Sequence, residues 1–323
     1  MDAAVQIGYG AAPRFGRHPD PEPLPGNSIV RVSAAPIVPL DLLCAGGRSY
    51  FGPPTLPYVP GVQGVGIVSE SSTYPPGTRV FFTTDAGMKP GDGSLAELCS
   101  ARDEDLVVID TNLADTAVAA LGLSAVAGWM ALSWRANLRS GETVLVLGAG
   151  GAVGQATIGA AHALGAGRVV ALCRSESSCL RAEEAGADRV VRMPTTADLT
   201  GLIDHLRKAC ADTADVVIDP VFGDAAVAAM AVLAPGGRLV NLGGAAGDTA
   251  TFSSSTLRSK SASVLGYTNN SLQPEQRAAA LRAVLGHAQS GRITVQHTVL
   301  PLADCQAGWQ LTVDGGTRVV LAP

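Results

Sequence analysis

The fold is decided by the stretch Val144-Leu145-Val146-Leu147-Gly148-Ala149-Gly150-Gly151-Ala152-Val153-Gly154. An apolar run of strand length stops at a glycine turn, and apolar residues then return at helical spacing. Glycines at 148, 151 and 154 allow a tight turn, a close backbone approach to a pyrophosphate, and close packing of the helix on the strand. Unpaired N–H groups at the start of that helix face the anion. The stretch therefore predicts a dinucleotide-binding loop, to which Gly150, Ala152 and Val153 also contribute backbone.

Helices and strands alternate after this loop. We expect helices at 152–164, 180–185, 198–210 and 224–233, and strands at 168–173, 189–191, 214–219 and 238–243. Such alternation indicates a parallel sheet covered on both faces. Because ligands of these sheets bind at the carboxyl ends of the strands, one crevice is expected along 148–154, 173–175, 219–221 and 241–244.

The first 118 residues have a different sequence pattern, in which short β-type runs alternate with clusters of proline and glycine. This pattern is typical of a partly open β-barrel. A helical run over 116–138, interrupted at Gly122 and Gly128, leads into the dinucleotide unit, and a helix at 274–290 and β-type pieces at 294–300 and 317–321 follow it. We expect a catalytic domain of residues 1–118 plus 267–323, with a nucleotide domain of residues 119–266 inserted between its two parts.

Composition narrows the class of protein. A length of 323 residues favours two domains, and a net charge of −5 argues against a nucleic-acid partner. We find no apolar run of the length needed to span a bilayer and recognise no N-terminal targeting sequence. We therefore expect a cytoplasmic protein without a membrane partner. The six cysteines form no C-x-x-C pair and the five histidines are scattered, which predicts reduced thiols and no metal site.

Four further segments resemble the medium-chain dehydrogenase/reductase superfamily over essentially the whole chain. They are Asp20-Pro21-Glu22-Pro23-Leu24-Pro25-Gly26, Leu56-Pro57-Tyr58-Val59-Pro60-Gly61, Leu138-Arg139-Ser140-Gly141-Glu142-Thr143-Val144-Leu145-Val146 and Leu233-Ala234-Pro235-Gly236-Gly237-Arg238-Leu239-Val240. Within that superfamily the chain is similar to the zinc-independent quinone oxidoreductase and enoyl reductase branch. The resemblance implies an α/β fold in which a Rossmann-type parallel sheet domain is inserted into a GroES-like, partly open β-barrel catalytic domain.

Two departures from the zinc alcohol dehydrogenases underlie this choice of branch. Where those enzymes carry a metal-binding cysteine, this chain has Ile37-Val38-Pro39-Leu40-Asp41, and where they carry Gly-His-Glu it has Gly61-Val62-Gln63. Valine and glutamine are not zinc ligands, so no metal is expected. Without a Lewis acid, conjugated acceptors become the easier substrates, because hydride addition to them leaves charge that ordinary hydrogen bonds stabilise.

The end of the second strand of the nucleotide domain governs the choice of nicotinamide cofactor. It reads Leu172-Cys173-Arg174-Ser175, without the carboxylate that holds the ribose hydroxyls of NAD. Arg174 offers donors to a 2′-phosphate and Ser175 a hydroxyl, which favours NADP(H). The lysine that relatives place nearby is Ser178 here, so Arg192 is a further candidate. Asn241, Gly243, Gly266 and Tyr267 are expected around the nicotinamide.

The substrate side is less sharply marked. Tyr50 matches by position the tyrosine that some enoyl reductases use as proton donor, although it can equally be a packed loop aromatic. Val38 and Asp41 stand in the family's substrate-contacting motif, with Asp41 more often a structural hydrogen-bonding residue. Ser124 and Trp129 are further substrate-cleft candidates, and both can equally be core residues.

These observations predict a zinc-independent, NADPH-dependent reductase that transfers hydride to an activated C=C bond or a quinone. The alternatives are an NADP(H)-binding redox sensor or structural protein without turnover, and a zinc-free carbonyl reductase or alcohol dehydrogenase. A small molecule is the expected partner, together with a second copy of the chain. The segment 259–267 is expected to be an edge strand that pairs two copies, and a proline at Ser263 is expected to disturb this pairing.

Overall fold

The computed structural model describes residues 1–194 and 198–323, and these form two compact units. The first unit comprises Met1–Gly122 and Gln296–Pro323, and the second comprises Leu123–Val295. Both ends of the chain build the first unit, and the middle of the chain builds the second. The division differs from the expected one at its second boundary, because residues 267–295 belong to the second unit.

The second unit is built on a six-stranded parallel sheet with the order β10-β9-β8-β11-β12-β13. Its central strands are almost wholly apolar and fully buried, as in a sheet covered on both faces. The parallel sheet predicted from the sequence is therefore confirmed. The strands are β8 (Thr143–Leu147), β9 (Arg168–Cys173), β10 (Arg189–Arg192), β11 (Ala214–Asp219), β12 (Leu233–Asn241) and β13 (Ser263–Gly266).

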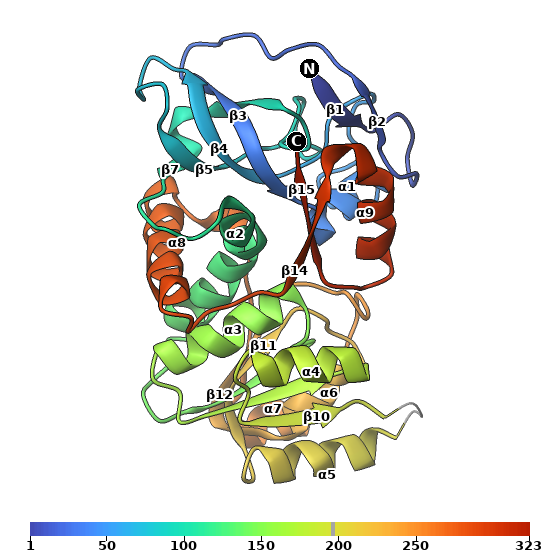
Figure 1. The fold of residues 1–323 in the computed structure, drawn as a ribbon. Helices are drawn as coiled ribbons and strands as arrows, with labels where there is room; N and C mark the ends of the chain where they lie inside the picture. The colour runs from blue at the N-terminus through green and yellow to red at the C-terminus, as the bar shows by residue number, and fades with distance from the viewer. Residues whose placement is uncertain (195–197) are drawn as a thin grey trace. The chain divides into compact units, whose positions relative to one another are not determined.

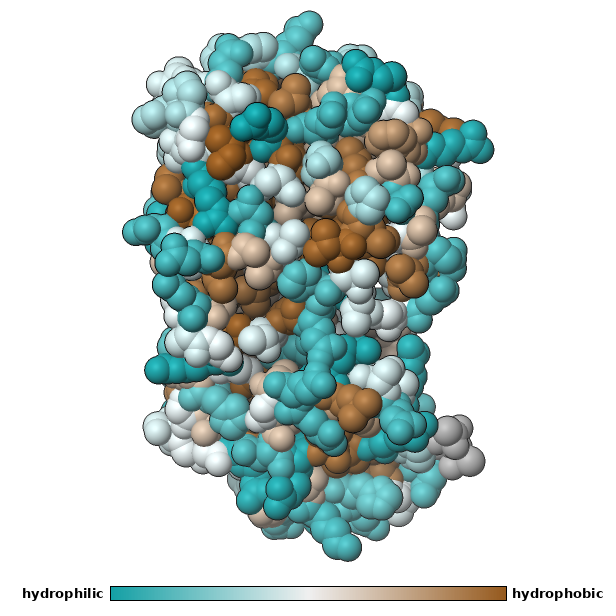
Figure 2. Space-filling model, viewed as in Figure 1, coloured by the Kyte–Doolittle hydropathy of each residue, from teal (hydrophilic) through white to brown (hydrophobic). Residues whose placement is uncertain are grey.

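Helices cover both faces of this sheet. Helices α3 and α4 pack on one face, and α6 and α7 pack on the other (Figure 1). Helix α5 packs against α6, and its outer side carries exposed Asp204, Arg207 and Lys208, over which Figure 2 shows a hydrophilic surface. The helices are α3 (Ala152–Ala163), α4 (Glu176–Glu184), α5 (Leu199–Ala209), α6 (Asp224–Ala231), α7 (Ser254–Lys260) and α8 (Pro274–Gln289).

Two elements of this unit differ from the expectation. Strand β12 begins at Leu233 rather than at residue 238, and its register with β11 shifts between Ala214 and Val216. The edge strand β13 spans only Ser263–Gly266, because residues 254–260 form α7. A strand does lie at the edge of the sheet as predicted, but it is shorter than the segment suggested.

The first unit contains a seven-stranded, mainly antiparallel sheet with the order β14-β15-β3-β4-β5-β7, in which β6 also pairs with β3. Its core is formed by large apolar side chains such as Phe82, Leu95 and Trp309. The strands are β3 (Asn27–Pro36), β4 (Gln63–Glu70), β5 (Arg79–Thr83), β6 (Leu98–Arg102), β7 (Leu106–Val108), β14 (His297–Pro301) and β15 (Arg318–Ala322). Two helices of this unit are α1 (Pro39–Ala45) and α9 (Cys305–Val313).

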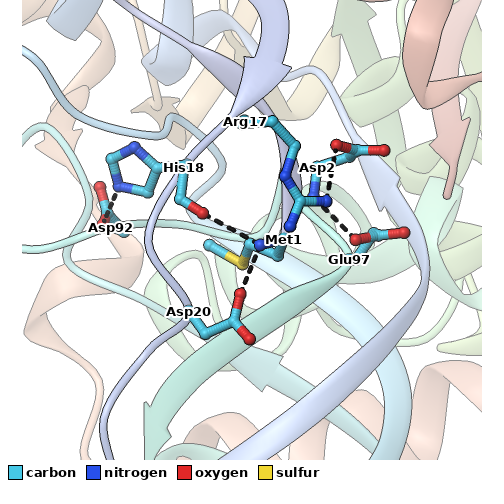
Figure 3. Close-up of polar contacts among 7 residues, drawn as sticks. All are labelled: Met1, Asp2, Arg17, His18, Asp20, Asp92 and Glu97. Carbon is cyan, nitrogen blue, oxygen red and sulfur yellow. Dashed lines mark hydrogen bonds and ion pairs between the residues drawn. The ribbon is translucent and has the colours of Figure 1, made fainter.

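A separate hairpin of β1 (Asp2–Val5) and β2 (Arg14–Arg17) is held by polar contacts (Figure 3). The Met1 amine donates to the His18 carbonyl at 3.0 Å and also pairs with the Asp20 carboxylate, which lowers the pKa of Asp20. His18 Nε2 lies 2.8 Å from Asp92 Oδ2, and the other oxygen of Asp92 accepts from the Val59 N–H at 2.8 Å. These contacts attach the hairpin to the loop that precedes β4.

Helix α2 (Asp115–Met130) carries the chain from the first unit to the second. Its backbone is non-helical at Gly122, as predicted, but helical at Gly128. Gly128 is needed for packing instead, since a Cβ there would collide with Thr157. Over Asp115–Arg135 the helical stretch is 21 residues long and apolar enough to cross a bilayer, which corrects our expectation, yet 67% of its most apolar window is buried inside the protein. Such burial is typical of a core helix.

Candidate functional site

The three predicted glycines of the binding loop have three different geometries. Gly148 has φ +59°, and a Cβ on it would lie 2.6 Å from Val221. Gly154 lies inside α3, where a Cβ would lie 2.5 Å from the Ala149 Cα. Gly151 is the N-cap of α3, and a Cβ there would meet only the Gly148 carbonyl oxygen, at 3.4 Å. Gly148 and Gly154 are thus required by packing, whereas Gly151 leaves the space in front of the helix open.

The first turn of α3 offers backbone donors to an anion. No side chain caps the helix at Gly151, and Ala152, Val153 and Gly154 form its first turn. The N–H groups of a first helical turn have no partner within the helix, and the helix dipole favours negative charge there. This is the geometry that the sequence predicted for a pyrophosphate.

Gly150 connects the glycine loop to helix α4 through a hydrogen bond and close packing. Its carbonyl oxygen accepts from Gln155 Nε2 and from Arg181 Nε, both at 2.9 Å. A Cβ on Gly150 would collide with Ser178 in the first turn of α4. The loop therefore packs directly on α4, so the two segments predicted to face the phosphates, 148–151 and 174–178, form one structural element.

The side chains predicted to hold a 2′-phosphate follow β9. Arg174 is exposed directly after the strand, and no partner for its guanidinium occurs among the described residues. Arg192 is also exposed and stands in register with Cys173, so the structure brings both arginines to the same edge of the sheet. Ser175 is the N-cap of α4, where its Oγ accepts from the Ser178 N–H at 3.2 Å. Its hydroxyl is thus engaged locally, and the arginines are the stronger phosphate candidates.

The ends of β11 and β12 form the next part of this edge. Asp219 was expected in the crevice but is fully buried, and its Oδ1 accepts from the N–H groups of Val221 at 3.0 Å and Phe222 at 2.7 Å. Burial raises the pKa of Asp219, and these backbone donors oppose the rise. Asn241 stands in register with Asp219 and donates to the Gly243 carbonyl at 2.9 Å. Asp219 therefore shapes the loop rather than contacting a ligand.

Gly266, the last residue of β13, and Tyr267, which follows it, continue the edge. The Gly266 carbonyl accepts from Arg135 Nε at 2.9 Å, and the Tyr267 N–H donates to the Asn241 carbonyl at 2.9 Å. The Tyr267 hydroxyl donates to Asn269 Oδ1 at 2.7 Å, and burial raises its pKa. Asn241, Gly243, Gly266 and Tyr267 thus lie together, and their contact with a nicotinamide stays a prediction.

The predicted substrate residues of the first unit are tied to its backbone. Val38 is the N-cap of α1 and is buried. Asp41 Oδ2 accepts from the Val38 N–H at 2.8 Å, and Oδ1 accepts from the Val62 N–H at 3.1 Å. Asp41 is itself buried, so it joins the start of α1 to the turn before β4. This supports the structural reading of Asp41.

A second charged group lies buried near Asp41. Arg318, at the start of β15, donates through Nη1 to the Ile37 carbonyl at 2.8 Å. Burial raises the pKa of Asp41 to about 6, while hydrogen bonds from Val38, Val62 and Gly61 and the charge of Arg318 oppose the rise. Burial likewise lowers the pKa of Arg318 to about 10, opposed by the charge of Asp41. No sequence signal pointed to Arg318, because a residue distant in the chain is joined to α1 only by the tertiary fold.

Gln63 and Tyr50 contrast in their exposure. Gln63 is buried, its Nε2 donates to the Ala119 carbonyl at 3.3 Å, and its side chain fills the space where Gly122 has no Cβ. Tyr50 is 79% exposed in the segment after α1, and its ring lies 4.3 Å from that of Phe51. Tyr50 is therefore not a packed loop aromatic, and its catalytic role stays a prediction.

Ser124 and Trp129, both on α2, belong to the second unit. Ser124 is buried, and the Trp129 ring lies 5.4 Å from the His287 ring of α8. The burial of Ser124 matches its alternative reading as a core residue, whereas Trp129 is only partly buried, and contact of either residue with a substrate stays a prediction. Sequence reasoning also missed Gln155 and Arg181, which hold the binding loop through contacts that no local motif reveals.

Known proteins share both the sequence and the fold of this chain. Residues 152–285 match the family model described as zinc-binding dehydrogenase. The chain is 32% identical to quinone oxidoreductase-like protein 2 of Bos taurus over 262 residues, which cover 78% of this chain and 72% of that protein. It is also 32% identical to the Rattus norvegicus protein of the same name, over 70% of this chain but only 63% of the relative, so it spans less than two thirds of that protein.

The fold has solved counterparts. The structure of the quinone oxidoreductase from Thermus thermophilus, a protein also determined in complex with NADPH, superimposes with a TM-score of 0.79 at 27% identity, and the match covers 100% of both chains. A structure of an NAD-dependent alcohol dehydrogenase superimposes with a TM-score of 0.84 at 25% identity, again over 100% of both chains. The predicted combination of a Rossmann-type and a GroES-like domain is confirmed by these neighbours. The chain belongs to the medium-chain dehydrogenase/reductase superfamily, in its quinone oxidoreductase branch.

Proposed function

We propose that this protein is a zinc-independent oxidoreductase that uses NADPH to reduce an activated C=C bond or a quinone. Membership of the family supports the general activity, that of an NAD(P)-dependent oxidoreductase. The choice of NADPH is supported by the Thermus thermophilus relative, which was determined in complex with NADPH. The choice of acceptor and the independence from zinc rest on the residues discussed below.

The observation that carries the proposal is the pair of exposed arginines at the end of β9 and β10. Arg174 directly follows β9 and Arg192 ends the adjacent strand β10, and the residues that follow β9 include no carboxylate before Glu176. A guanidinium is a planar donor that suits a phosphate, whereas an NAD-selective site presents an acidic residue at this point. The site therefore fits a 2′-phosphate.

The binding loop fits the rest of the cofactor. The open space at Gly151 and the uncapped first turn of α3 suit a pyrophosphate, and the edge formed by Asn241, Gly243, Gly266 and Tyr267 would lie along the nicotinamide half. When bound, the cofactor supplies the hydride. The protein's part is to hold the phosphates through backbone N–H groups and arginines and to fix the orientation of the ring.

The residues at the family's zinc position do not fit a metal. Val38 offers no ligand atom, and the Gln63 amide is turned to the Ala119 carbonyl. Both carboxylate oxygens of nearby Asp41 accept hydrogen bonds from backbone N–H groups. These contacts support a reaction that needs no Lewis acid, and a conjugated acceptor meets that condition because its developing negative charge can be held by hydrogen-bond donors.

Tyr50 is the proposed proton donor or enolate partner, since its exposed hydroxyl is free to approach a substrate. Two other functions remain as alternatives. A zinc-free carbonyl reductase would use the same cofactor site, and a redox sensor would bind NADP(H) without turnover. Steady turnover with an enone or quinone separates the proposal from both.

We further propose a soluble, cytoplasmic homodimer. Strand β13 is the edge of the parallel sheet, and the Val264 side chain on it is 42% exposed. Since the Tyr267 N–H donates to β12, the alternation along a strand turns the N–H groups of Val264 and Gly266 toward the open edge. The proline test therefore belongs at Val264 rather than at Ser263.

The cofactor proposal is tested by titrating the purified protein with NADPH and with NADH under the same conditions. We expect tighter binding of NADPH, and a loss of that preference in Arg174→Ala. A site that binds NADH as tightly as NADPH would contradict the proposed role of the two arginines.

A further inference from the structure

The N-terminal turn that contains Tyr9 contacts both ends of the segment 46–54, which follows α1 in the first unit. The Gly10 N–H donates to the carbonyl of Ala45, the residue before the segment, at 3.0 Å. The Tyr9 hydroxyl donates to the carbonyl of Pro54, the last residue of the segment, at 2.7 Å. One short turn therefore joins the start of the segment to its end.

The Tyr9 ring also packs against the inside of this segment. Gly47 has φ +66°, a backbone conformation that suits glycine. A Cβ on Gly47 would lie 3.6 Å from Tyr9 Cδ1 and 3.6 Å from the Pro53 Cβ, so Gly47 is close to both residues. The ring and the hydroxyl of Tyr9 thus act on the segment at two separate places.

Gln6 fixes the turn around Tyr9 to the rest of the unit. The Gln6 N–H donates to the Tyr58 carbonyl at 2.8 Å, and the Tyr58 N–H donates to the Gln6 carbonyl at 3.2 Å. The buried Gln6 amide donates through Nε2 to the carbonyls of Gly8 and Ala11, the latter at 3.0 Å. The turn is therefore bonded at its base and across its own backbone, which makes it a firm support for the segment.

Tyr50 lies inside the supported segment. Its neighbours are ordered locally, because the Phe51 N–H donates to Ser49 Oγ at 3.3 Å and the Gly52 N–H donates to the Ser49 carbonyl at 3.0 Å. Among the described residues, no hydrogen bond holds the Tyr50 hydroxyl, and its side chain is exposed. The place of that hydroxyl thus depends on the backbone of the segment, and through this backbone on Tyr9.

We propose that Tyr9 is a positioning residue that holds the segment 46–54 in the conformation from which Tyr50 donates its proton. The inference rests on the proposed function, since it concerns the same reaction. In that reaction the acceptor receives a hydride from NADPH and a proton from the Tyr50 hydroxyl, and a proton from solvent restores the hydroxyl. Tyr9 itself transfers nothing, but it limits the positions that the Tyr50 hydroxyl can reach.

The first measurement follows hydrogen exchange of the segment 46–54 in the full-length protein by mass spectrometry of peptides. Tyr9→Phe removes the hydrogen bond to Pro54 and keeps the ring, so exchange should be about threefold to tenfold faster, as for the loss of one hydrogen bond. Tyr74→Phe is the matched control, because the Tyr74 hydroxyl donates to the Asp103 carbonyl at 3.1 Å and has no bond to the segment. Equal exchange in Tyr9→Phe and the wild type would overturn the inference.

The second measurement is a double-mutant cycle of Tyr9→Phe and Tyr50→Phe, with NADPH and three enones: cyclohexenone, methyl vinyl ketone and chalcone. Tyr9→Phe should lower kcat about threefold to tenfold and leave the KM for NADPH unchanged. In the Tyr50→Phe background the same change should have no further effect, because no hydroxyl is left to position. A purely structural role would lower kcat equally in both backgrounds, and that result would contradict the positioning role.

The wild type and Tyr50→Phe are measured before the Tyr9 variants. A wild type without turnover would overturn the proposed reaction, and an unchanged kcat in Tyr50→Phe would overturn the role of Tyr50. Either result removes the positioning role of Tyr9 as well. If Tyr50→Phe loses activity and Tyr9→Phe keeps it, only the inference about Tyr9 is wrong.

Discussion

The carboxyl edge of the parallel sheet and the segment 38–63 of the first unit use their polar groups in opposite ways. At the sheet edge, donors are left open to a ligand, as in the first turn of α3 and in exposed Arg174 and Arg192. In the segment 38–63, Asp41 and Gln63 are buried and bonded to the backbone of the protein itself. The first arrangement is the one expected of a binding site, and the second is that of a scaffold.

The difference shows what each region contributes to the reaction. At the carboxyl edge of the parallel sheet, the groups predicted to recognise the cofactor are side chains and backbone N–H groups. Their positions follow directly from the local sequence. The segment 38–63 holds a loop shape with buried hydrogen bonds and leaves the side chain of Tyr50, the proposed proton donor, exposed. Substitutions in both regions test this division of roles.

The largest effect is expected from Gly154→Ala. The added Cβ would lie 2.5 Å from the Ala149 Cα, so the loop must shift to admit it. Overpacking of this kind costs about 3 kcal/mol and exceeds the roughly 1 kcal/mol that alanine gains over glycine in a helix. Denaturant unfolding should show the loss in the free energy of unfolding.

Gly151→Ala is the matched control for that change. Its Cβ meets only the Gly148 carbonyl at 3.4 Å, and its φ of −79° suits any residue. We expect a loss of stability below about 1 kcal/mol, as for an alanine N-cap, together with weaker binding of NADPH. If both alanine variants lost the same stability, the distinction between packing and ligand-facing glycines would be wrong.

The second effect concerns Arg174. Arg174→Ala should raise the KM for NADPH on the order of tenfold to a hundredfold and leave that for NADH nearly unchanged, since a charge-assisted phosphate contact is worth about 1.5–3 kcal/mol. Arg189→Ala is the control, because Arg189 is exposed at the opposite end of β10. Equal losses with both cofactors would show that Arg174 does not contact the phosphate.

The third effect is a dependence of stability on pH that Asp41 creates. Its folded pKa of about 6 lies above the ordinary value of 3.8, so the folded state binds the proton more tightly than the unfolded state. Its contribution to stability is therefore present below pH 4 and is lost as the pH rises toward 6, with a magnitude of about 3 kcal/mol.

The comparison with Asp41→Asn isolates this contribution. The asparagine does not titrate, so the free energy of unfolding of the variant should fall less than that of the wild type across the same pH window. Equal slopes in this window would mean that Asp41 is not the buried titrating group.

The smallest effect is expected from Val264→Pro in β13. The N–H that it removes faces the open edge of the sheet, so the change should shift a dimer toward monomer without unfolding the chain. Ser263→Pro serves as the contrast, because its N–H faces β12 and its loss should lower stability instead. Light scattering reports the mass, and a wild-type monomer at micromolar concentration would contradict the proposed dimer.

The cofactor unit could be predicted from sequence because its signals are local. The glycine spacing at 148–154 and the alternation that follows it located the sheet, the binding loop and Arg174. The packing of Gly150 on Ser178 and the engagement of Ser175 in the cap of α4 could not be predicted, since they depend on how close two helices approach.

The first unit was less predictable, because its key contacts join segments that are far apart in the sequence. Its β-type runs indicated the strands, but the partners of Asp41 and Gln63 come from segments far along the chain, namely Arg318 and Ala119. The boundary near residue 266 also differed, because α8 packs with the second unit through contacts such as that of His287 with Trp129. Contacts between distant segments produce no periodic pattern in a single sequence, so they could not be predicted from it.

The central claim is that this protein is a zinc-independent, NADPH-dependent reductase of conjugated acceptors. The most direct measurement follows the fall in NADPH absorbance with a panel of enones, enoyl esters and quinones, in the presence and absence of a metal chelator. We predict turnover with at least one conjugated acceptor, faster with NADPH than with NADH and unchanged by the chelator. Activity that the chelator abolishes and zinc restores, or turnover confined to simple carbonyls, would contradict it.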